Sequence, residues 1–379
     1  MNKTIIEEFK DLPSPCFVCE EELLRKNLEL LQQVQNEAGV KILLALKGFA
    51  LWSTFDLCKE YLQGCCASGL HEALLAKEEF GKEVHTYSPA FKDEEIDEIL
   101  DISNHVVFNS FNQWKHFRNK AIGKASCGLR INPEYSSVEV DLYNPCGAFS
   151  RLGITKDNFQ EAEIEGIEGF HFHALCEQNV DALQGALLNF EKNFSQYFSQ
   201  LKWVNFGGGH HITRKDYDVQ GLITLLKDFK KRYPHLEVFL EPGEAVGWQT
   251  GYLVATVLDI VNNGMDIAIL DTSAEAHMPD TLAMPYRADI RESGLINEKE
   301  HTYRLGGNTC LAGDIIGDYS FDKPLNIGDK IILEDMIHYT MVKTTTFNGI
   351  KLPSIAIQKD GCYQIVNDYG YNDYKIRLS

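Results

Sequence analysis

The chain has 379 residues, which is long enough for one large barrel and a second, smaller domain. A formal net charge of −19 argues against a nucleic-acid partner and is compatible with a cationic ligand. No stretch approaches 18 uncharged apolar residues, so no membrane span is expected. The charged start MNKTIIEEFK lacks the pattern of a secretory signal. A cytoplasmic protein with reduced cysteines is therefore predicted.

Short apolar runs alternate with segments of helical spacing over the first two thirds of the chain. Strands that alternate with helices indicate parallel βαβ units, and eight such units predict a (β/α)8 barrel over about residues 22–250. A doubly wound sheet is the rival, but LKGFALW supplies no glycine-rich turn after the first strand. The predicted strands are VKILLALK (40–47), QGCCAS (63–68), EVHTYS (83–88), HVVFN (105–109), SCGLRI (126–131), IEGFHFHA (167–174), LKWVNF (201–206) and LEVFLE (236–241).

After about residue 250 the pattern changes to strands with little helix between them. We expect an all-β domain here, formed by residues 251–379 together with 1–21, because PCFVCE (15–20) is strand-like and precedes the first helix. The expected strands are YLVATVLDIV, MDIAILD, KIILED, HYTMVKTTTF and PSIAIQ. Cys16 and Cys19 form a CxxC pair without a second pair or a nearby histidine, so it is interpreted as structural and no metal site is predicted.

In a barrel of this kind the chemistry lies at the carboxyl ends of the strands. The side chains and loops delivered there are Lys47, Arg130, His173, the loop Gly207-Gly208-Gly209, and Glu241 followed by Pro242-Gly243-Glu244. A lone lysine is most often solvated, and a glycine run is often only a turn. His171 and His173 share a strand face, so one of them is expected to be structural. A buried Glu241 needs a partner.

These features together describe one cofactor. Glycines can let backbone N–H groups surround a phosphate, a carboxylate can pair with a ring nitrogen, an imidazole can stack on a ring, and a lysine can bond to an aldehyde. The combination predicts pyridoxal 5'-phosphate.

The order of these motifs resembles the fold-type III pyridoxal phosphate-dependent decarboxylases, the group of the ornithine, arginine and diaminopimelate enzymes. Within that group the chain is most similar to the carboxynorspermidine/carboxyspermidine decarboxylases, over roughly residues 12–375. The segments that carry the likeness are SPAF, YNPCGAFSRLGI, HFHALCE, WVNFGGGHHIT, LEPGEAVGWQTG, AHMPDTLAMPYR and CLAGD.

The resemblance implies a barrel with a C-terminal β domain, a homodimer with shared active sites, and a role in polyamine biosynthesis. It implies that Lys47 bonds to the cofactor aldehyde, His173 stacks on its ring and Glu241 pairs with its ring nitrogen. It further implies a phosphate site at Gly207, Gly208 and Gly209, with Tyr339 nearby and Arg130 in support. Cys310 would reach the partner's site and protonate Cα. An inert cysteine is the alternative reading of Cys310.

The residue after EPG points to the substrate. Diaminopimelate decarboxylases carry an arginine there to grip a distal carboxylate, whereas this chain has Glu244. An acid would repel a carboxylate and attract an ammonium. His277, Asp280 and Asp314 complete the predicted substrate-binding set, with loop capping as the alternative for both aspartates. The expected substrate is a carboxylated polyamine, and the choice between carboxyspermidine and carboxynorspermidine stays open because one methylene separates them.

Other functions are less well supported. A decarboxylase of another basic amino acid or of diaminopimelate would keep the site, but AHMPD and GEA point away from ornithine. An amino-acid racemase usually pairs the ring nitrogen with arginine, and Glu241 favours decarboxylation instead. A non-catalytic relative would tend to lose the lysine, the cysteine or the glycines, which are all present.

Overall fold

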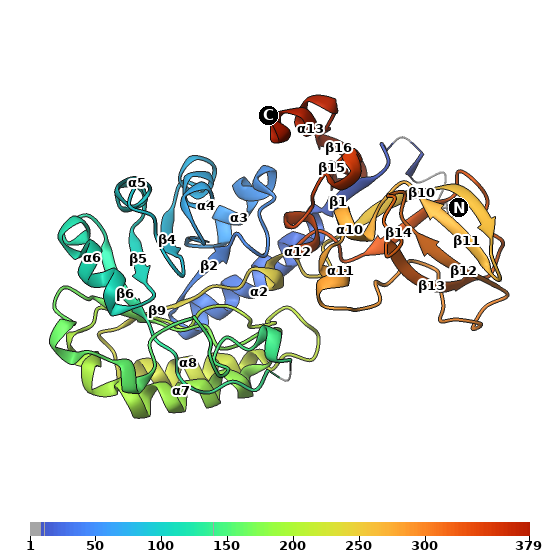
Figure 1. Ribbon diagram of the computed structural model, residues 1–379. Coiled ribbons are helices and arrows are strands. Elements are labelled where there is room, and N and C mark those ends of the chain that lie inside the picture. Colours follow the sequence, from blue (N-terminus) through green and yellow to red (C-terminus); the bar gives the residue numbers. More distant parts are fainter. Residues whose placement is uncertain (1–8, 11, 139) are drawn as a thin grey trace. The chain divides into compact units, whose positions relative to one another are not determined.

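The computed structural model describes residues 9, 10, 12–138 and 140–379 (Figure 1). The chain divides into two compact units. One unit is the continuous segment Arg25–Val246, and the other combines Gly247–Ser379 with the described residues before Arg25. Each unit is described separately below.

The first unit is a closed barrel of parallel strands. Each strand lies inside one of the eight runs predicted from the sequence, so the predicted barrel is confirmed. In order around the barrel the strands are β2 (Lys41–Ala45), β3 (Gly64–Ala67), β4 (Glu83–Tyr87), β5 (His105–Phe108), β6 (Ser126–Arg130), β7 (Gly169–His171), β8 (Trp203–Asn205) and β9 (Glu237–Leu240). β9 pairs with β2 and closes the barrel.

Helices cover the outside of the barrel (Figure 1). Helix α8 shows why they form, because the Asp218 side chain accepts a hydrogen bond from Gly221 N–H and so caps its first turn. Its buried Leu222, Leu226 and Phe229 recur at helical spacing along one face. The helices are α2 (Glu21–Ala38), α3 (Phe55–Tyr61), α4 (Leu70–Leu75), α5 (Ile96–Ile102), α6 (Phe111–Ala121), α7 (Val180–Phe194), α8 (Val219–Arg232) and the short α9 (Glu244–Gly247).

The second unit is built on a mixed sheet. Strand β1 lies between β10, to which it is antiparallel, and β15, to which it is parallel, so the N-terminal strand joins this sheet as predicted. The order is β13-β12-β11-β10-β1-β15-β16, and β14 also pairs with β10. The strands are β1 (Cys16–Glu20), β10 (Gly251–Asn262), β11 (Asp266–Leu270), β12 (His301–Gly306), β13 (Ile315–Phe321), β14 (Lys330–Glu334), β15 (Ser354–Lys359) and β16 (Cys362–Asn367).

This unit also contains short helices, and one of them forms where a strand was expected. The segment HYTMVKTTTF forms helix α12 (Tyr339–Val342) and a turn, so the strand prediction was wrong there. The backbone N–H of Thr345 bonds to the carbonyl of Ala276. This tertiary contact prevails over the β propensity of the threonine run. The other helices are α10 (Ala274–His277), α11 (Asp280–Ala283) and α13 (Tyr371–Leu378).

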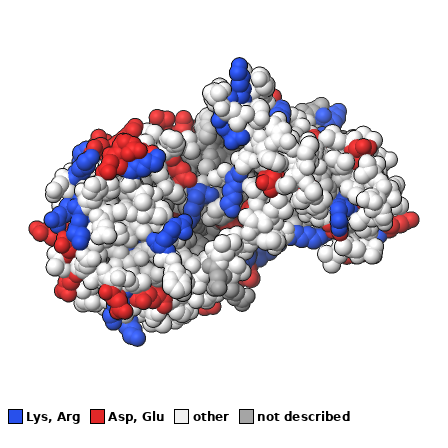
Figure 2. Space-filling model, in the orientation of Figure 1, with Lys and Arg blue, Asp and Glu red and all other residues white. Residues whose placement is uncertain are grey.

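The surface is mixed in charge. On the face drawn in Figure 2, acidic and basic side chains are interspersed over the barrel unit, without a broad basic patch. Among the described helices, none combines the length and apolar character that a membrane crossing requires. 

Candidate active site

Lys47 lies in the turn that follows β2, at the carboxyl end of the barrel. A Cβ atom on Gly48 would come within 2.9 Å of the backbone nitrogen of Glu244, so this turn packs tightly against the loop after β9. The Lys47 side chain keeps solvent access, but the protein around it desolvates the amine and lowers its pKa. Arg130 acts in the same direction, while Cys66 and Glu241 oppose it. The amine is thus shifted toward its neutral, nucleophilic form.

Glu241 follows the last barrel strand and is only 6% exposed. Its Oε1 accepts a hydrogen bond from the Asn205 amide at 2.6 Å, and its Oε2 lies 3.2 Å from His171 Nε2. Burial alone would raise the pKa of Glu241, but His171 and Asn205 outweigh it and lower the pKa to about 2. The carboxylate is therefore anionic at neutral pH and held in a fixed orientation.

His171 and Asn205 are functional candidates that sequence reasoning missed. They end strands β7 and β8, which pair in parallel with His171 directly opposite Asn205. A signal was present, because a polar residue at the end of a barrel strand faces the same mouth as Glu241. Of the two histidines expected to share a face, His171 is the one that supports Glu241.

His173 is oriented by the glycine loop. Its Nδ1 accepts a hydrogen bond from Gly208 N–H at 2.9 Å, which places the proton of the neutral ring on Nε2. Burial lowers the pKa of His173 well below its usual value, and the nearby Lys47 and Arg130 charges lower it further. The ring is therefore neutral and fixed on one side by backbone.

Positions 207, 208 and 209 require glycine because a Cβ atom at any of them would collide with the backbone. A Cβ on Gly208 would lie 2.3 Å from the Glu241 carbonyl oxygen, and one on Gly209 would lie 2.1 Å from that of Leu175. Gly207 and Gly209 also have positive φ angles of 70° and 80°. The N–H of Gly207 donates to Asn205 Oδ1 at 2.8 Å. Two of the three N–H groups thus fix the side chains of Asn205 and His173.

Arg130 ends strand β6 and is 6% exposed. Its guanidinium stacks on the Tyr87 ring at 4.5 Å and donates to the carbonyl oxygen of His173 at 3.3 Å. The Tyr87 hydroxyl in turn donates to Asn109 Oδ1. Arg130 therefore lies at the same barrel mouth as Lys47 and His173, as the sequence predicted.

Glu244 is the first residue of helix α9 and is partly buried. Its Oε2 lies 3.9 Å from His211 Nε2. Because the Lys47–Gly48 turn packs against the backbone of Gly243 and Glu244, the Glu244 side chain starts beside Lys47. The barrel unit thus brings together Lys47, Arg130, His173, the glycine loop, Glu241 and Glu244.

The remaining predicted residues belong to the sheet unit. Cys310 is exposed in the loop between β12 and β13, where its backbone N–H donates to Asn348 Oδ1 at 2.7 Å. Tyr339 begins helix α12, and the Lys343 amine lies 5.3 Å from its ring centroid.

The three predicted polar residues of the sheet unit differ in what they can still bind. Asp314 is buried, and its carboxylate accepts hydrogen bonds from Thr309 and from Glu275 N–H, so the loop-capping alternative fits it. His277 is 0% exposed and bonds to Thr272. Asp280 Oδ2 accepts from Tyr286 and Thr340, whereas its buried Oδ1 has no partner among the described residues. Asp280 is the acid with capacity left for a donor.

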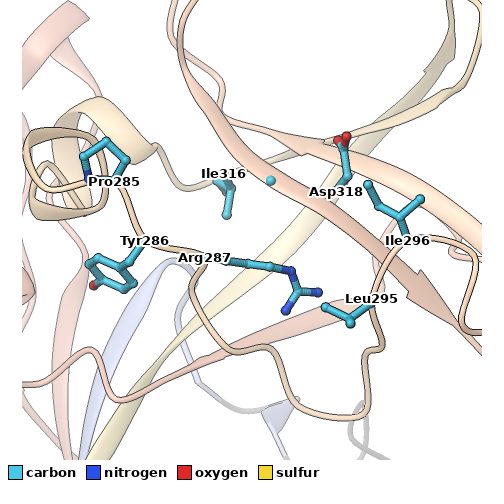
Figure 3. Close-up of a pocket in the computed structure, with 8 residues that line it drawn as sticks. Pro285, Tyr286, Arg287, Leu295, Ile296, Ile316 and Asp318 are labelled. Carbon is cyan, nitrogen blue, oxygen red and sulfur yellow. The ribbon is translucent and has the colours of Figure 1, made fainter.

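The sheet unit also contains a pocket of about 600 Å³ (Figure 3). Arg287 extends into it between Leu295 and Ile316 (Figure 3). The guanidinium is already engaged, since it stacks on the Tyr319 ring at 3.9 Å and donates to the Gly294 carbonyl. None of the predicted site residues lines this pocket.

Comparison with known proteins decides the family. A profile described as "Pyridoxal-dependent decarboxylase, C-terminal sheet domain" matches residues 16–337. The chain belongs to the pyridoxal-dependent decarboxylases. It is 52% identical to carboxynorspermidine/carboxyspermidine decarboxylase of Campylobacter jejuni, over 97% of this chain and 99% of that one. This family membership makes the protein a decarboxylase.

A further relative and a solved structure support the assignment. Carboxyaminopropylagmatine decarboxylase of Synechocystis is 47% identical, over 97% of this chain and 96% of that protein. The crystal structure of Campylobacter jejuni carboxynorspermidine decarboxylase complexed with norspermidine superposes with a TM-score of 0.91 at 51% identity. It covers 97% of this chain and 100% of that chain. The resemblance to the fold-type III decarboxylases is thereby confirmed.

The barrel mouth fits the cofactor of this family. An aldehyde needs an amine with a lowered pKa, which Lys47 offers. A protonated ring nitrogen needs an anion held in a buried position, which Glu241 offers. The glycine loop keeps the floor free of side chains, because any Cβ there would collide with backbone. Lys47 and Glu241 therefore fit the aldehyde and the ring nitrogen of the group that the family requires, whereas the N–H groups of Gly207 and Gly208 are already bonded to protein side chains.

Proposed function

We propose that this protein removes the carboxyl group of a carboxylated polyamine, carboxynorspermidine or carboxyspermidine, with pyridoxal 5'-phosphate bound at the barrel mouth. The observation that carries the proposal is the pairing of a lysine of lowered pKa with an anionic, anchored Glu241 at one end of the barrel. The 52% identical relative with the corresponding name supports the substrate class.

Each barrel residue would have a different role in the reaction. The cofactor supplies an electron sink for the electron pair that remains when carboxylate departs as CO2. Lys47, whose amine has a lowered pKa, would hold the cofactor through its aldehyde. Glu241, anchored by Asn205 and His171, would pair with the ring nitrogen and favour its protonated form. His173, fixed through Nδ1 by Gly208, would hold the ring by stacking.

Acidic groups would select a cationic substrate tail. Glu244 starts beside Lys47, so an arginine-like grip on a distal carboxylate is absent at this position. Asp280 offers Oδ1, a buried acceptor without a partner in the described structure, and an unsatisfied carboxylate oxygen is costly. An ammonium or guanidinium of the substrate would satisfy it. Asp280 therefore remains a substrate-binding candidate, and so does His277, whose buried Nε2 also lacks a hydrogen-bond partner among the described residues. Asp314 is better explained as a support of its loop.

Carboxyaminopropylagmatine is a second candidate substrate. The Synechocystis relative, at 47% identity, is named for carboxyaminopropylagmatine, whose name specifies an agmatine tail. Both tails are cationic, so Glu244 and Asp280 do not by themselves distinguish them. We place the carboxylated polyamine first because two relatives, at 52% and 38% identity, carry that name.

The decisive experiment measures CO2 release from five compounds in parallel. These are carboxynorspermidine, carboxyspermidine, carboxyaminopropylagmatine, diaminopimelate and ornithine. We expect the highest kcat/KM with the first two compounds. Preference for carboxyaminopropylagmatine would replace the substrate and keep the reaction, and release from diaminopimelate alone would contradict the role given to Glu244.

The protein is further proposed to act as a homodimer in which Cys310 completes the partner's site and donates a proton to Cα. The exposed position of Cys310 in a loop supports this reading. Lys47→Ala and Cys310→Ala chains are each expected to be inactive, and mixing them should create dimers with one intact site. Recovery of about a quarter of the wild-type activity is expected for random pairing. If the mixture stays inactive, the sites are not shared.

A further inference from the structure

A group of polar side chains lies inside the barrel at the amino-terminal ends of two strands, opposite to the end that holds Lys47 and Glu241. Glu83 is the first residue of β4, and His85 follows two residues later on the same face. His105 is the first residue of β5 and is the direct register partner of His85. The interior of such a barrel is normally filled by branched apolar side chains, so this group needs an explanation.

The three side chains converge to the spacing of a metal site. Glu83, His85 and His105 each offer one ligand atom, and these atoms all lie within 4.8 Å of one another. The imidazole centroids of His85 and His105 are 3.9 Å apart with 30° between the ring planes, so one ring must turn for both to coordinate the same ion. His85 Nε2 lies 3.1 Å from Glu83 Oε2. Two imidazoles and a carboxylate form a common donor set for zinc and related ions.

Both imidazoles have a buried nitrogen that the protein leaves unsatisfied. Across the described residues, no group bonds to Nδ1 of His85 or to Nδ1 of His105. His85 as a whole is 2% exposed, so water has little access to it. Buried polar nitrogens usually have a partner, and two orphans in adjacent rings are uncommon. These atoms point to a ligand with which the two rings can coordinate.

Aromatic side chains pack against both imidazoles. His105 stacks on Trp203 at 4.7 Å with 19° between the planes, and His85 meets Phe239 edge-on at 4.7 Å. Trp203 is itself fixed by a hydrogen bond from Nε1 to Ser126 Oγ. Rigid packing of the supporting residues is what a metal site requires of its surroundings.

One charge at the cluster competes with a cation. The Lys41 amine lies 2.8 Å from Glu83 Oε1 and 3.1 Å from Glu237 Oε1. Since Glu237 can keep Lys41 paired, Glu83 can turn to a metal ion without leaving a bare ammonium. Lys41 nevertheless repels an incoming dication, so the affinity is expected to be sensitive to its removal.

We propose that Glu83, His85 and His105 bind a divalent first-row transition-metal ion, with zinc as the expected occupant and water in the remaining position. The partial exposure of Glu83 and His105 leaves a route for the ion and that water. The bound ion would link β4 to β5 at the end of the barrel away from the chemistry. The sequence predicted no metal site, because only strand pairing brings His105 beside His85.

The test measures zinc and cobalt binding to the chelator-treated, tag-free holoenzyme. Competition with a chromophoric chelator should find one tight zinc site per chain. Because loss of supporting residues alone weakens metal sites by 10–100-fold, His105→Phe and Glu83→Gln should each weaken binding at least about 100-fold. Phenylalanine keeps a ring against Trp203, and glutamine keeps the shape of Glu83, so both variants are expected to fold.

Two further variants complete the experiment, one expected to strengthen zinc binding and one expected to leave it unchanged. Lys41→Met should tighten zinc binding by at least about tenfold, because it removes a nearby like charge. His116→Phe, which changes a histidine paired with Asp93 outside the barrel, should leave zinc binding unchanged. The cobalt form should show d–d absorption without a thiolate charge-transfer band. Absence of a stoichiometric site, or a site that survives both His105→Phe and Glu83→Gln, would overturn the proposal.

Discussion

The side-chain Nδ2 of Asn205 donates a hydrogen bond to Glu241 Oε1 at 2.6 Å, and the side-chain Oδ1 of Asn205 accepts one from Gly207 N–H at 2.8 Å. One residue therefore connects the carboxylate that would face the ring nitrogen with the first glycine of the loop. This bidentate role fixes which end of the Asn205 amide faces the carboxylate, because only the NH2 group can donate to Glu241.

The first prediction tests this connection. Asn205→Asp would place a second acid against Glu241, raise the pKa of Glu241 and break the bond to the carboxylate. We expect kcat/KM to fall by about 10²-fold or more, with a shifted visible spectrum of the bound cofactor. Asn158→Asp, an exposed position, is the matched control and should retain activity. Equal activity in both variants would show that Asn205 does not matter for the reaction.

The second prediction concerns the pH dependence of Lys47. Desolvation lowers its pKa from the ordinary 10.5, so the neutral amine becomes abundant at lower pH than in a solvated lysine. Covalent capture of pyridoxal by the cofactor-free protein, fixed with borohydride and mapped by mass spectrometry, should therefore reach half its maximal rate below pH 10.5. Lys47→Ala should lose this fast fraction. A midpoint at the ordinary lysine value would contradict the inferred desolvation.

The third prediction concerns acid stability and Glu241. The pKa of Glu241 is about 2 in the folded protein against an ordinary value of 4.5, so its contribution to stability is present above pH 4.5 and is lost as pH falls toward 2. The difference in unfolding free energy between the cofactor-free wild type and Glu241→Gln should reach at most about 3 kcal/mol and shrink over this window. Urea denaturation at several pH values measures it, and a difference independent of pH would refute the shift.

The fourth prediction tests the substrate tail. Glu244→Arg should abolish turnover of carboxyspermidine, because an arginine repels the cationic tail, while the cofactor absorbance persists. Glu244→Gln removes the charge but keeps the size and should retain part of the activity. Unchanged turnover in Glu244→Arg would remove the argument that this position selects the tail. 

The fifth prediction concerns the space around Gly208. A methyl group there would meet the Glu241 carbonyl oxygen at 2.3 Å, so Gly208→Ala must displace either the loop or the strand end. We expect weaker cofactor binding and a lower melting temperature. Gly370→Ala is a suitable control, because nothing lies within 4 Å of its added Cβ. Normal cofactor affinity in Gly208→Ala would show that the loop tolerates the shift.

The sequence was informative wherever burial imposed a simple pattern. Runs such as ILLAL are apolar because a barrel strand is covered on both sides, and the polar residue that follows them marks the mouth. Lys47, His173 and Glu241 were found by this rule. His171 and Asn205 were not assigned roles, since their importance depends on a hydrogen-bond network between three different strand ends.

Other features required three-dimensional information. The run Thr344-Thr345-Thr346 has high strand propensity, but helix α12 precedes it and Thr345 bonds to Ala276 instead of to a neighbouring strand. The capping role of Asp314 was left open from sequence alone, because it depends on where Thr309 and Glu275 lie. The structure of the threonine run and the role of Asp314 therefore depend on contacts between segments that are distant in the sequence.

The position of β1 between β10 and β15 has a consequence for synthesis of the chain. The barrel is encoded without interruption from Arg25 to Val246, whereas β1 leaves the ribosome long before either of its neighbours exists. Domains generally fold as units during translation, so the barrel can close while Phe17 and Val18 still lack partners. Those apolar residues therefore lack their sheet neighbours until the last strands of the chain have been made.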